Sequence, residues 1–436
     1  MAAITSNSVR YIVEGGHRLA GEIEPAGNKN AALPIIAAAL LTDQKVTLTN
    51  VPRIRDVEAL VELIRTVGAL AEWTGPNMLV IEAKKVRPAA LDPELCARIR
   101  ASILLAGPLL ARAGKVTLPP PGGDVIGRRR VDTHFLALQQ MGARVSVGQN
   151  YDFRAGRLKG ADVFLDEPSV TGTENALMAA TAAQGTTVLR NVASEPHVQD
   201  LANFLVMLGA KIEGIGTNTM TVQGGTVLGG GTWRIGPDHI EVGSLIGLAA
   251  VTRSELRIKR AGVEHFRAIL MGFERLGIIC RIEGDDLVVP AQQTRRIRPD
   301  FGGHVPKIED QPWPAFPADL MSIAIVAATQ CSGMILFFEK MFESRLFFVD
   351  KLIDMGAQII LNDPHRATVI GLDRKNALRG IKMSSPDIRA GVALLIAALS
   401  AQGESEISNV EQIDRGYQDI ETRLKNLGAQ IERVLI

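Results

Sequence analysis

A short polar sequence near the N-terminus has residues suited to binding an anion. Gly27, Asn28, Lys29 and Asn30 lead directly into the apolar sequence AALPIIAAALL, so they should lie at the start of a buried helix. The free N–H groups of a helix start and a lysine ammonium both attract negative charge. An N-capping turn with a solvated lysine is the alternative interpretation.

A second candidate is the loop at residues 119–132, PPPGGDVIGRRRVD, which is too rich in proline and glycine for a helix or a central strand. It carries one acidic residue, Asp124, followed by three arginines, Arg128, Arg129 and Arg130. Arginines bind phosphate, and a single carboxylic acid can transfer a proton. We expect an ordered but mobile loop, with a solvated basic loop as the alternative.

A third candidate is Asp319 in the proline-rich sequence QPWPAFPADL, at the start of another apolar helix. Aspartate there is commonly an N-cap, but in a cleft it could act as a general base. Single arginines recur later in the chain, each of which could simply be a surface or ion-paired residue. If they converge with Lys29 and Arg129, they would bind a ligand with a carboxylate and a phosphate. These arginines are Arg345 in FESRLF, Arg389 in SSPDIRAG and Arg415 in QIDRGYQDI.

A six-fold repeat predicts the elements that position these residues. Phrases such as MGARVSV and LGAKIEG place a glycine after an amphipathic helix and before a strand. In the first copy the helix has one apolar face, formed by Val57, Leu60, Val61 and Ile64. The repeated glycines lie 67 to 79 residues apart, at Gly68, Gly142, Gly209, Gly277, Gly356 and Gly428.

Each unit also contains a second helix, rich in alanine and with little polar surface, which must be buried on most sides. The units read β-α-β-α-β-β, and six of them predict an α/β fold with two groups of three around two cores. The apolar helices should lie inside a ring of sheets. A glycine-rich sequence, GGGTWRIGPD, predicts the boundary after the third unit, and ligands commonly bind between two such domains.

Composition excludes several classes of function. The 436 residues include 48 Lys plus Arg against 47 Asp plus Glu, so nothing favours nucleic acid or an anionic membrane as partner. The N-terminal residues show no basic segment followed by an apolar one, and no apolar stretch reaches about 18 residues, so we expect a soluble cytoplasmic protein. Phosphate-loop, dinucleotide, HExxH and GxSxG motifs are absent. The three cysteines, Cys96, Cys280 and Cys331, lack zinc or disulfide spacing and should be buried.

At these residues the chain resembles the UDP-N-acetylglucosamine 1-carboxyvinyltransferase family of enolpyruvyl transferases. The resemblance spans nearly the whole chain and rests on the phrases GNKNAALP, IRASILLAGPL, PPGGDVIGRRRVDTH, GTENALMAA, SEPHVQDLANFL, GPDHIEVG, FPADL, FESR, PDIRAG and IDRGYQDIE. It implies transfer of the enolpyruvyl group of phosphoenolpyruvate to the 3′-hydroxyl of UDP-N-acetylglucosamine, with release of phosphate from a tetrahedral intermediate. This reaction opens peptidoglycan precursor synthesis. The resemblance implies no metal, no organic cofactor and no obligate protein partner.

The resemblance also implies a fold of two inside-out α/β barrel domains, each of three βαβαββ repeats. The first domain would be residues 29–236, which carry the loop at 119–132. The second would be discontinuous, formed by residues 1–28 and 237–436. The active site is expected in the cleft between the two domains.

Site residues follow from the resemblance position by position. Lys29, Asp124 and Asp319 would be catalytic, with Asp319 taking the proton of the 3′-hydroxyl. Lys29, Arg129 and Arg415 would hold the phosphate of phosphoenolpyruvate, and Arg100, Arg345 and Arg389 would favour its carboxylate. The UDP-sugar would contact Asn30, Arg100, Arg129, Arg130, Val131, Asp132, Thr133, Ser169, Val170, Thr171, Asp319 and Met341. Glu195, Asp238 and Asp387 match family positions around the cleft.

Three positions depart from the family pattern. Most members have a cysteine at the position of Asp124, and fosfomycin alkylates that thiol, so this chain is predicted to be insensitive to fosfomycin. Because a carboxyl group is normally ionised at neutral pH and a thiol is not, Asp124 as general acid predicts an acidic activity optimum. Trp313 replaces a common histidine and Thr171 a common glycine, which affects the shape of the nucleotide pocket.

Two other functions remain open. A 5-enolpyruvylshikimate-3-phosphate synthase would share the repeats, the lysine and the arginines, although GNKNAALP lacks the serine-rich start expected for a shikimate-phosphate site. A non-catalytic paralogue that only binds the sugar nucleotide would explain the substitution at Asp124. RNA-terminal cyclase-like proteins share related repeats, but the near-neutral charge and the motifs disfavour them.

Overall fold

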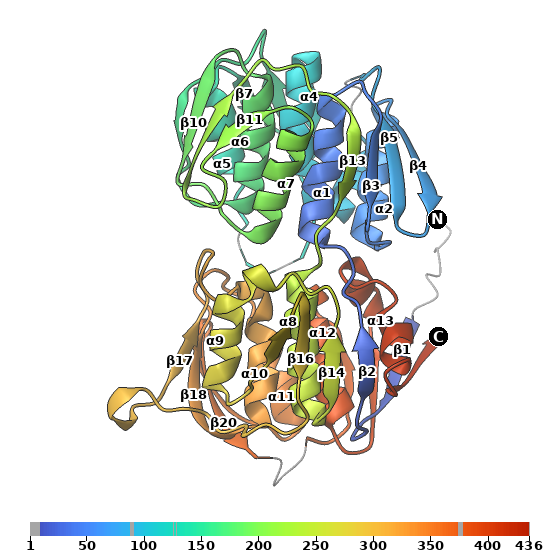
Figure 1. Ribbon diagram of the computed structural model, residues 1–436, viewed down its shortest axis with the longest axis vertical. Helices are drawn as coiled ribbons and strands as arrows, with labels where there is room; N and C mark the ends of the chain where they lie inside the picture. The colour runs from blue at the N-terminus through green and yellow to red at the C-terminus, as the bar shows by residue number, and fades with distance from the viewer. Residues whose placement is uncertain (1–8, 88–90, 125, 128, 374–377, 436) are drawn as a thin grey trace. The chain divides into compact units, whose positions relative to one another are not determined.

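The computed structural model describes residues 9–87, 91–124, 126–127, 129–373 and 378–435, and it contains two compact units (Figure 1). The first unit comprises Ala26–Asp124 and Arg129–Gly236. The second comprises the chain up to Pro25, the short stretch between Asp124 and Arg129, and the chain from Pro237 onward. The buried apolar residues of each unit form a cluster of their own, so each unit has its own core.

The six repeated glycines end six helices, as the sequence predicts. All have positive φ, between 72° and 109°, a conformation that glycine adopts without steric cost. At Gly68, the glycine N–H donates to Arg65 O at 3.0 Å and the next N–H, of Ala69, donates to Ile64 O at 3.2 Å. This Schellman pattern recurs at every copy. The helices are α2 (Arg55–Thr66), α5 (Asp132–Gln140), α7 (Pro196–Met207), α9 (Arg267–Arg275), α11 (Val349–Asp354) and α13 (Ile420–Lys425).

The sheets of the first unit follow the predicted repeat, except in its second copy. Two have four strands. One has the strand order β13 (Gly231–Arg234), β3 (Val46–Thr49), β5 (Met78–Glu82), β4 (Leu70–Gly75), and the other has the order β11 (Lys211–Glu213), β12 (Thr219–Gln223), β10 (Thr186–Arg190), β9 (Asp162–Phe164). The third, among the described residues, has three strands: β6 (Lys115–Leu118), β8 (Tyr151–Arg154) and β7 (Arg144–Val147). In this copy the helix α3 (Pro93–Arg98) precedes the buried segment.

The second unit has three four-stranded sheets. The first has the strand order β15 (Arg281–Glu283), β16 (Asp286–Val289), β14 (Glu255–Ile258), β2 (Ala20–Ile23). The second has the order β17 (Lys307–Glu309), β18 (Ser332–Phe338), β20 (Arg366–Leu372), β19 (Gln358–Asp363). The third has the order β21 (Lys382–Ser384), β22 (Glu404–Ser408), β1 (Val9–Glu14), β23 (Gln430–Leu435). Every four-stranded sheet combines one parallel pair with antiparallel pairs. A β-α-β crossover followed by a hairpin gives this pattern.

Strand exchange explains why the second unit uses both ends of the chain. Strand β2, which precedes the first buried helix, pairs in parallel with β14 of the second unit. Its expected place in the first unit is taken by β13, which pairs in parallel with β3. Strand β1 lies between β22 and β23.

Apolar helices fill the inside of each unit, with sheets and amphipathic helices around them (Figure 1). In the second unit α8 (His239–Thr252), α10 (Met321–Thr329) and α12 (Ile388–Ser400) pack on one another, and every residue in them is buried. In the first unit the inner elements are α1 (Lys29–Ala38), α6 (Val170–Ala182) and, in place of one long helix, the 3₁₀-helix η2 (Arg100–Leu105) followed by α4 (Ala106–Ala113). The predicted fold class is confirmed.

Two smaller features bear on earlier predictions. Cys96 and Cys331 are buried and Cys280 is half-buried, all three as free thiols. Within the described parts of the chain, no helix has the length and apolar character needed to cross a membrane.

Candidate functional site

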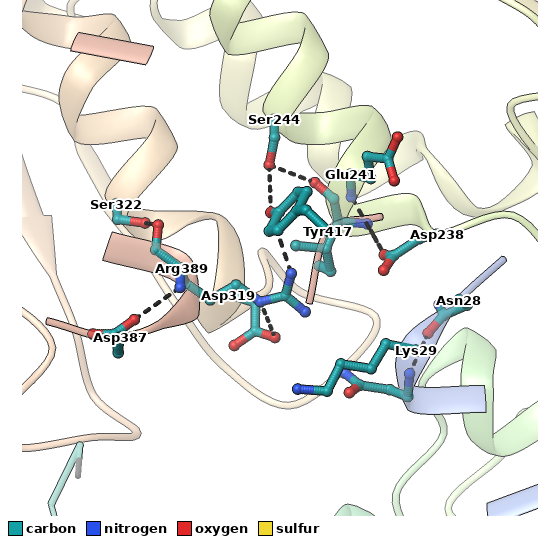
Figure 2. Close-up of polar contacts among 12 residues, drawn as sticks. Asn28, Lys29, Asp238, Glu241, Ser244, Asp319, Ser322, Asp387, Arg389 and Tyr417 are labelled. Carbon is teal, nitrogen blue, oxygen red and sulfur yellow. Dashed lines mark hydrogen bonds and ion pairs between the residues drawn. The ribbon is translucent and has the colours of Figure 1, made fainter. Parts of the chain in front are cut away.

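Lys29 is the first residue of α1 and is buried with a carboxylate partner. Asn28 caps the helix, accepting from the backbone N–H groups of Asn30 at 2.8 Å and Ala31 at 3.2 Å (Figure 2). Lys29 Nζ lies 2.9 Å from Asp56 Oδ2 at the start of α2, and the two side chains are 11% and 6% exposed. The solvated-lysine interpretation is therefore wrong. An ammonium has three donors, so this ion pair leaves it able to bind a further anion.

Arg100 ties the loop at 119–132 to the buried helices of the first unit. Its Nη2 donates to the carbonyl oxygens of Arg129 and Arg130, both at 2.8 Å. Burial, and then the positive charge of Arg129, lower the pKa of Arg100 to about 10. Asp124 and Arg129 are half-buried, which does not fit a fully solvated loop. Arg128 lies outside the described residues.

The end of the loop is held by Asp166. Arg130 is exposed and pairs with Asp132 at 2.7 Å and with Asp166 at 3.0 Å. The buried hydroxyl of Thr133 donates to Asp166 at 2.7 Å. Val131 is buried immediately before α5 begins at Asp132. Of the two loop arginines that the structure describes, Arg130 is exposed and fits the solvated alternative, whereas Arg129 is half-buried.

A buried histidine of α5, His134, joins that helix to α6. Ser169 caps α6 and Val170 begins it. Asn175 Nδ2 donates to His134 Nδ1 at 2.8 Å, so Nε2 carries the proton and donates to the Thr171 hydroxyl at 3.0 Å. Burial, with the charge of Arg100, lowers the pKa of His134 to about 3. The hydroxyl of Thr171, one of the three departures, thus satisfies a buried neutral histidine.

Asp319, in the second unit, is held by two arginines. It lies in the 3₁₀-helix η5 (Ala318–Leu320), whose N-cap position is Pro317, so the N-cap interpretation is wrong. Arg345 Nη2 lies 2.5 Å from Asp319 Oδ1. Arg389 Nε lies 3.1 Å from Asp319 Oδ2 (Figure 2). The two arginine side chains are only 10% and 6% exposed. Two guanidinium groups on one carboxylate leave a net positive charge, which favours binding of an anion.

Two hydroxyl groups, linked to each other, hold the guanidinium group of Arg389 in place. Its Nη1 donates to the hydroxyl of Tyr417 at 3.2 Å, and that hydroxyl lies 3.0 Å from Ser244 Oγ on α8 (Figure 2). Burial disfavours the charge of Arg389, but Asp319 and other neighbours outweigh it and raise the pKa of Arg389 above its usual value. Arg345 behaves in the same way, so both arginines stay charged. Asp56, Tyr417 and Ser244 were not predicted from the sequence, although Tyr417 lies within the phrase QIDRGYQDI.

The other predicted residues of the second unit lie on separate elements. Arg415 ends the 3₁₀-helix η6 (Val410–Arg415) and donates to Gln412 at 2.9 Å. Asp387 and Asp238 are the N-caps of α12 and α8. Met341 is exposed.

Two further predicted positions are Trp313 in the second unit and Glu195 in the first. The ring of Trp313 packs edge-on against the imidazoles of His239 and His265, with ring centres 5.9 and 6.4 Å apart. Glu195 precedes α7.

The chain matches a known protein family and named relatives over nearly its full length. Residues 13–424 match the family model EPSP synthase (3-phosphoshikimate 1-carboxyvinyltransferase). The chain is 73% identical to UDP-N-acetylglucosamine 1-carboxyvinyltransferase of Bradyrhizobium diazoefficiens, over 98% of both chains. It is 53% identical to the protein of the same name from Treponema denticola, over 97% of this chain and 98% of the relative.

Two solved structures share the fold at low sequence identity. The enolpyruvyl transferase NikO from Streptomyces tendae superposes with a TM-score of 0.86 at 24% identity, over 99% of this chain and 100% of that one. EPSP synthase from Acinetobacter baumannii gives a TM-score of 0.75 at 18% identity, over 98% of this chain and 100% of that one. The family model and the sequence relatives show that the chain belongs to the EPSP synthase (3-phosphoshikimate 1-carboxyvinyltransferase) family, and within it to the UDP-N-acetylglucosamine 1-carboxyvinyltransferases.

Proposed function

We propose that this chain transfers the enolpyruvyl group of phosphoenolpyruvate to the 3′-hydroxyl of UDP-N-acetylglucosamine and releases phosphate, the first committed step of peptidoglycan precursor synthesis. The observation that carries the proposal is the carboxylate of Asp319 held between the buried guanidinium groups of Arg345 and Arg389. It combines a base for a hydroxyl group with cations for an anionic co-substrate. The names of relatives 73% and 53% identical over nearly the full length support the same reaction.

The proposed chemistry is an addition followed by an elimination. Asp319 takes the proton of the 3′-hydroxyl as its oxygen bonds to C2 of phosphoenolpyruvate, and Asp124 gives a proton to C3. Loss of a proton from C3 then expels phosphate and regenerates the double bond. No metal or organic cofactor takes part in this scheme.

The phosphoenolpyruvate contacts are proposed from charge and burial. Lys29, which is buried with Asp56, would hold the phosphate together with Arg129 and Arg415. The remaining arginines, Arg100, Arg345 and Arg389, would favour the carboxylate, because guanidinium groups bind carboxylates in a bidentate manner. The positive charge that Arg345 and Arg389 retain on burial supports this assignment.

The nucleotide-sugar contacts are proposed from the resemblance and from the ordering of the loop end by Asp166. They are Asn30, Arg100, Arg129, Arg130, Val131, Asp132, Thr133, Ser169, Val170, Thr171, Asp319 and Met341. We further propose a cytoplasmic location with only small-molecule partners, since 48 basic and 47 acidic residues give no field for nucleic acid.

The experiment is phosphate release from phosphoenolpyruvate with UDP-N-acetylglucosamine, compared with shikimate 3-phosphate, from pH 5 to 9. Release with the sugar nucleotide alone supports the proposal. Release with shikimate 3-phosphate would instead assign the reaction printed for the family model. Tight nucleotide binding without release would identify a non-catalytic paralogue.

A pair of lysine variants makes the test specific. Lys29→Ala should lower kcat/KM by more than about 100-fold, because a buried cation at the proposed phosphate site is lost. Lys84→Ala is the matched control, since Lys84 also pairs with a carboxylate at 2.9 Å, that of Glu82, but is 73% exposed. Equal activity of the two variants would contradict the role of Lys29.

A further inference from the structure

Two buried acidic residues lie side by side at the ends of neighbouring parallel strands in the second unit. Asp310 directly follows β17 and Glu339 directly follows β18, and these strands pair in parallel with Glu309 opposite Phe338. Both Asp310 and Glu339 are 0% exposed. Neither was singled out from the sequence, and neither has a part in the proposed chemistry.

The two carboxyl groups have different partners. Asp310 accepts from the backbone N–H of Lys340 at 2.5 Å and from that of Met341 at 3.2 Å. Both carboxyl oxygens of Glu339 are buried, and the described residues offer them no hydrogen-bond donor. A buried carboxylate without donors is unfavourable, whereas a protonated carboxyl group can donate to Asp310.

The electrostatic surroundings favour a proton on Glu339. Burial, followed by the charge of Asp310 and a hydrogen bond with it, raises the pKa of Glu339 to about 9. Of the other charged groups nearby, Arg345 lowers this pKa and Asp319 raises it. The ring of His365 donates to the backbone carbonyl of Glu339 at 2.7 Å rather than to its carboxyl group.

Asp310 and Glu339 each begin a segment that leads to the candidate site. From Asp310 the chain runs to Asp319, and from Glu339 it runs through Lys340 and Met341 to Arg345. These segments end in the Arg345–Asp319 ion pair of 2.5 Å. Arg345 Nε is buried without a hydrogen-bond partner among the described residues, so the placement of Arg345 depends on Asp319 and on the segment that carries it.

We propose that Glu339 carries a proton that it shares with Asp310, and that this pair positions the segment from Lys340 to Arg345 so that Arg345 meets Asp319. Asp310 and Glu339 are positioning residues, because they act through the backbone contacts of Asp310 and not on the substrate. The inference rests on the proposed function for its kinetic readout, but the shared proton itself can be measured without any turnover.

Three variants test which residue carries the proton. Glu339→Gln keeps a neutral donor of the same shape, so its kcat/KM at pH 7.5 should remain within about threefold of wild type. Asp310→Asn offers one acceptor oxygen to two N–H groups, and Glu339→Met offers no donor. Both should lose about 10–100-fold in kcat/KM, with a raised KM for phosphoenolpyruvate, because misplacement of a site residue has this order of effect. Equal losses in Glu339→Gln and Glu339→Met would overturn the proposal, and so would full activity of Asp310→Asn.

The pH dependence supplies a readout that a purely structural role would not change. Wild-type activity should fall as pH rises through about 9, when Glu339 loses its proton, and Glu339→Gln should lack that fall. An identical alkaline limb in both proteins would contradict the shared proton.

Stability gives an independent test that does not need activity. The pKa of Glu339 is raised from 4.5 to about 9 in the folded state. The contribution of Glu339 to the free energy of unfolding is therefore lost as pH rises through that range. The melting temperature of Glu339→Gln relative to wild type should therefore increase steadily from pH 5 to pH 9. A constant difference would sink the inference. Absence of phosphate release by wild type would refute only the proposed function.

Discussion

Asp319 shows how a single side chain sets the charge of its surroundings. With one carboxylate between two guanidinium groups, the group as a whole is cationic, and burial strengthens its attraction for an anion. Tyr417 and Ser244 keep Arg389 in place without adding charge. The proposed base for the sugar hydroxyl and the proposed cations for phosphoenolpyruvate therefore lie within a few ångströms of each other.

Asp124 is the residue whose chemistry is most open to a direct test. As the proposed general acid it should give an activity optimum at acidic pH, because a carboxylic acid is deprotonated at lower pH than a thiol. Asp124→Asn should remove this dependence and lower kcat by about 100-fold or more, the range of general acid catalysis. The measurement is the pH profile of phosphate release between pH 5 and 9.

The matched variant for the same residue is Asp124→Cys. It should retain activity, move the optimum to higher pH and become inactivated by fosfomycin with a covalent adduct, whereas the wild-type protein should not react. An adduct on wild type, or an optimum that Asp124→Asn leaves unchanged, would argue against this role.

Residue types at the site could be predicted from the sequence, but most of their partners could not. Lys29, Asp319, Arg345 and Arg389 stand out because charged residues beside apolar helices are conspicuous. Their contacts join positions far apart in the chain: Arg389 is 70 residues from Asp319. Local sequence does not specify such pairs, which is why Asp319 and Lys29 each carried a second interpretation that the structure shows to be wrong.

At the scale of elements, helix ends were the most predictable feature. The glycine phrase predicts both the end of a helix and its left-handed cap, and all six copies adopt the Schellman pattern. The buried segment of the second repeat was less predictable. Its sequence reads as one helix, but it forms η2 and then α4, with Pro108 near the start of α4. Proline lacks the N–H that a continuous helix would need there.

The caps can be tested where no steric clash interferes. Gly142 follows α5 with φ 93° and has nothing within 4 Å of an added Cβ, so Gly142→Ala tests backbone conformation alone. We expect a loss of about 1–2 kcal/mol, the cost of a left-handed alanine. This corresponds to a fall in melting temperature of roughly 2–8 °C for a unit of this size.

The matched control for the cap is Gly148→Ala. Gly148 is also open, with nothing within 4 Å of an added Cβ, but its φ is not in the left-handed region. The variant should melt within about 1 °C of wild type, since surface substitutions of this kind have small effects. Equal destabilisation by the two substitutions would mean that cap conformation is not what the repeated glycine supplies.

At the scale of the whole molecule, the repeat count predicts two cores of three units, which the structure contains. The exchange of β2 and β13 between units has no local signal, because each strand has the same character in either place. The exchange is determined by which distant strands pair, β13 with β3 and β2 with β14. Each unit therefore has a terminal piece supplied from a distant part of the sequence, and its stability depends on that piece staying paired.

Both cores also contain a buried neutral histidine, and this predicts how the whole protein responds to acid. Burial is the main cause that lowers the pKa of His134 in the first unit and of His239 in the second to about 3, from the usual 6.5. The unfolded chain takes up these protons as pH falls below about 6.5 while the folded chain does not, so stability must fall between pH 6.5 and pH 3. The loss at pH 5 is roughly 2 kcal/mol for each histidine, at about 1.36 kcal/mol per pH unit.

Calorimetric unfolding of His134→Gln from pH 4.5 to 7.5 checks this expectation. The variant should be less stable than wild type at pH 7.5, because the buried bonds to Thr171 and Asn175 are disturbed, yet its melting temperature should depend less on pH. His304→Gln is the matched control, since His304 is exposed and its replacement should leave both the melting temperature and its slope with pH unchanged. If His134→Gln keeps the wild-type slope, the acid sensitivity of the first unit comes from its carboxylates and not from the histidine buried beneath Thr171.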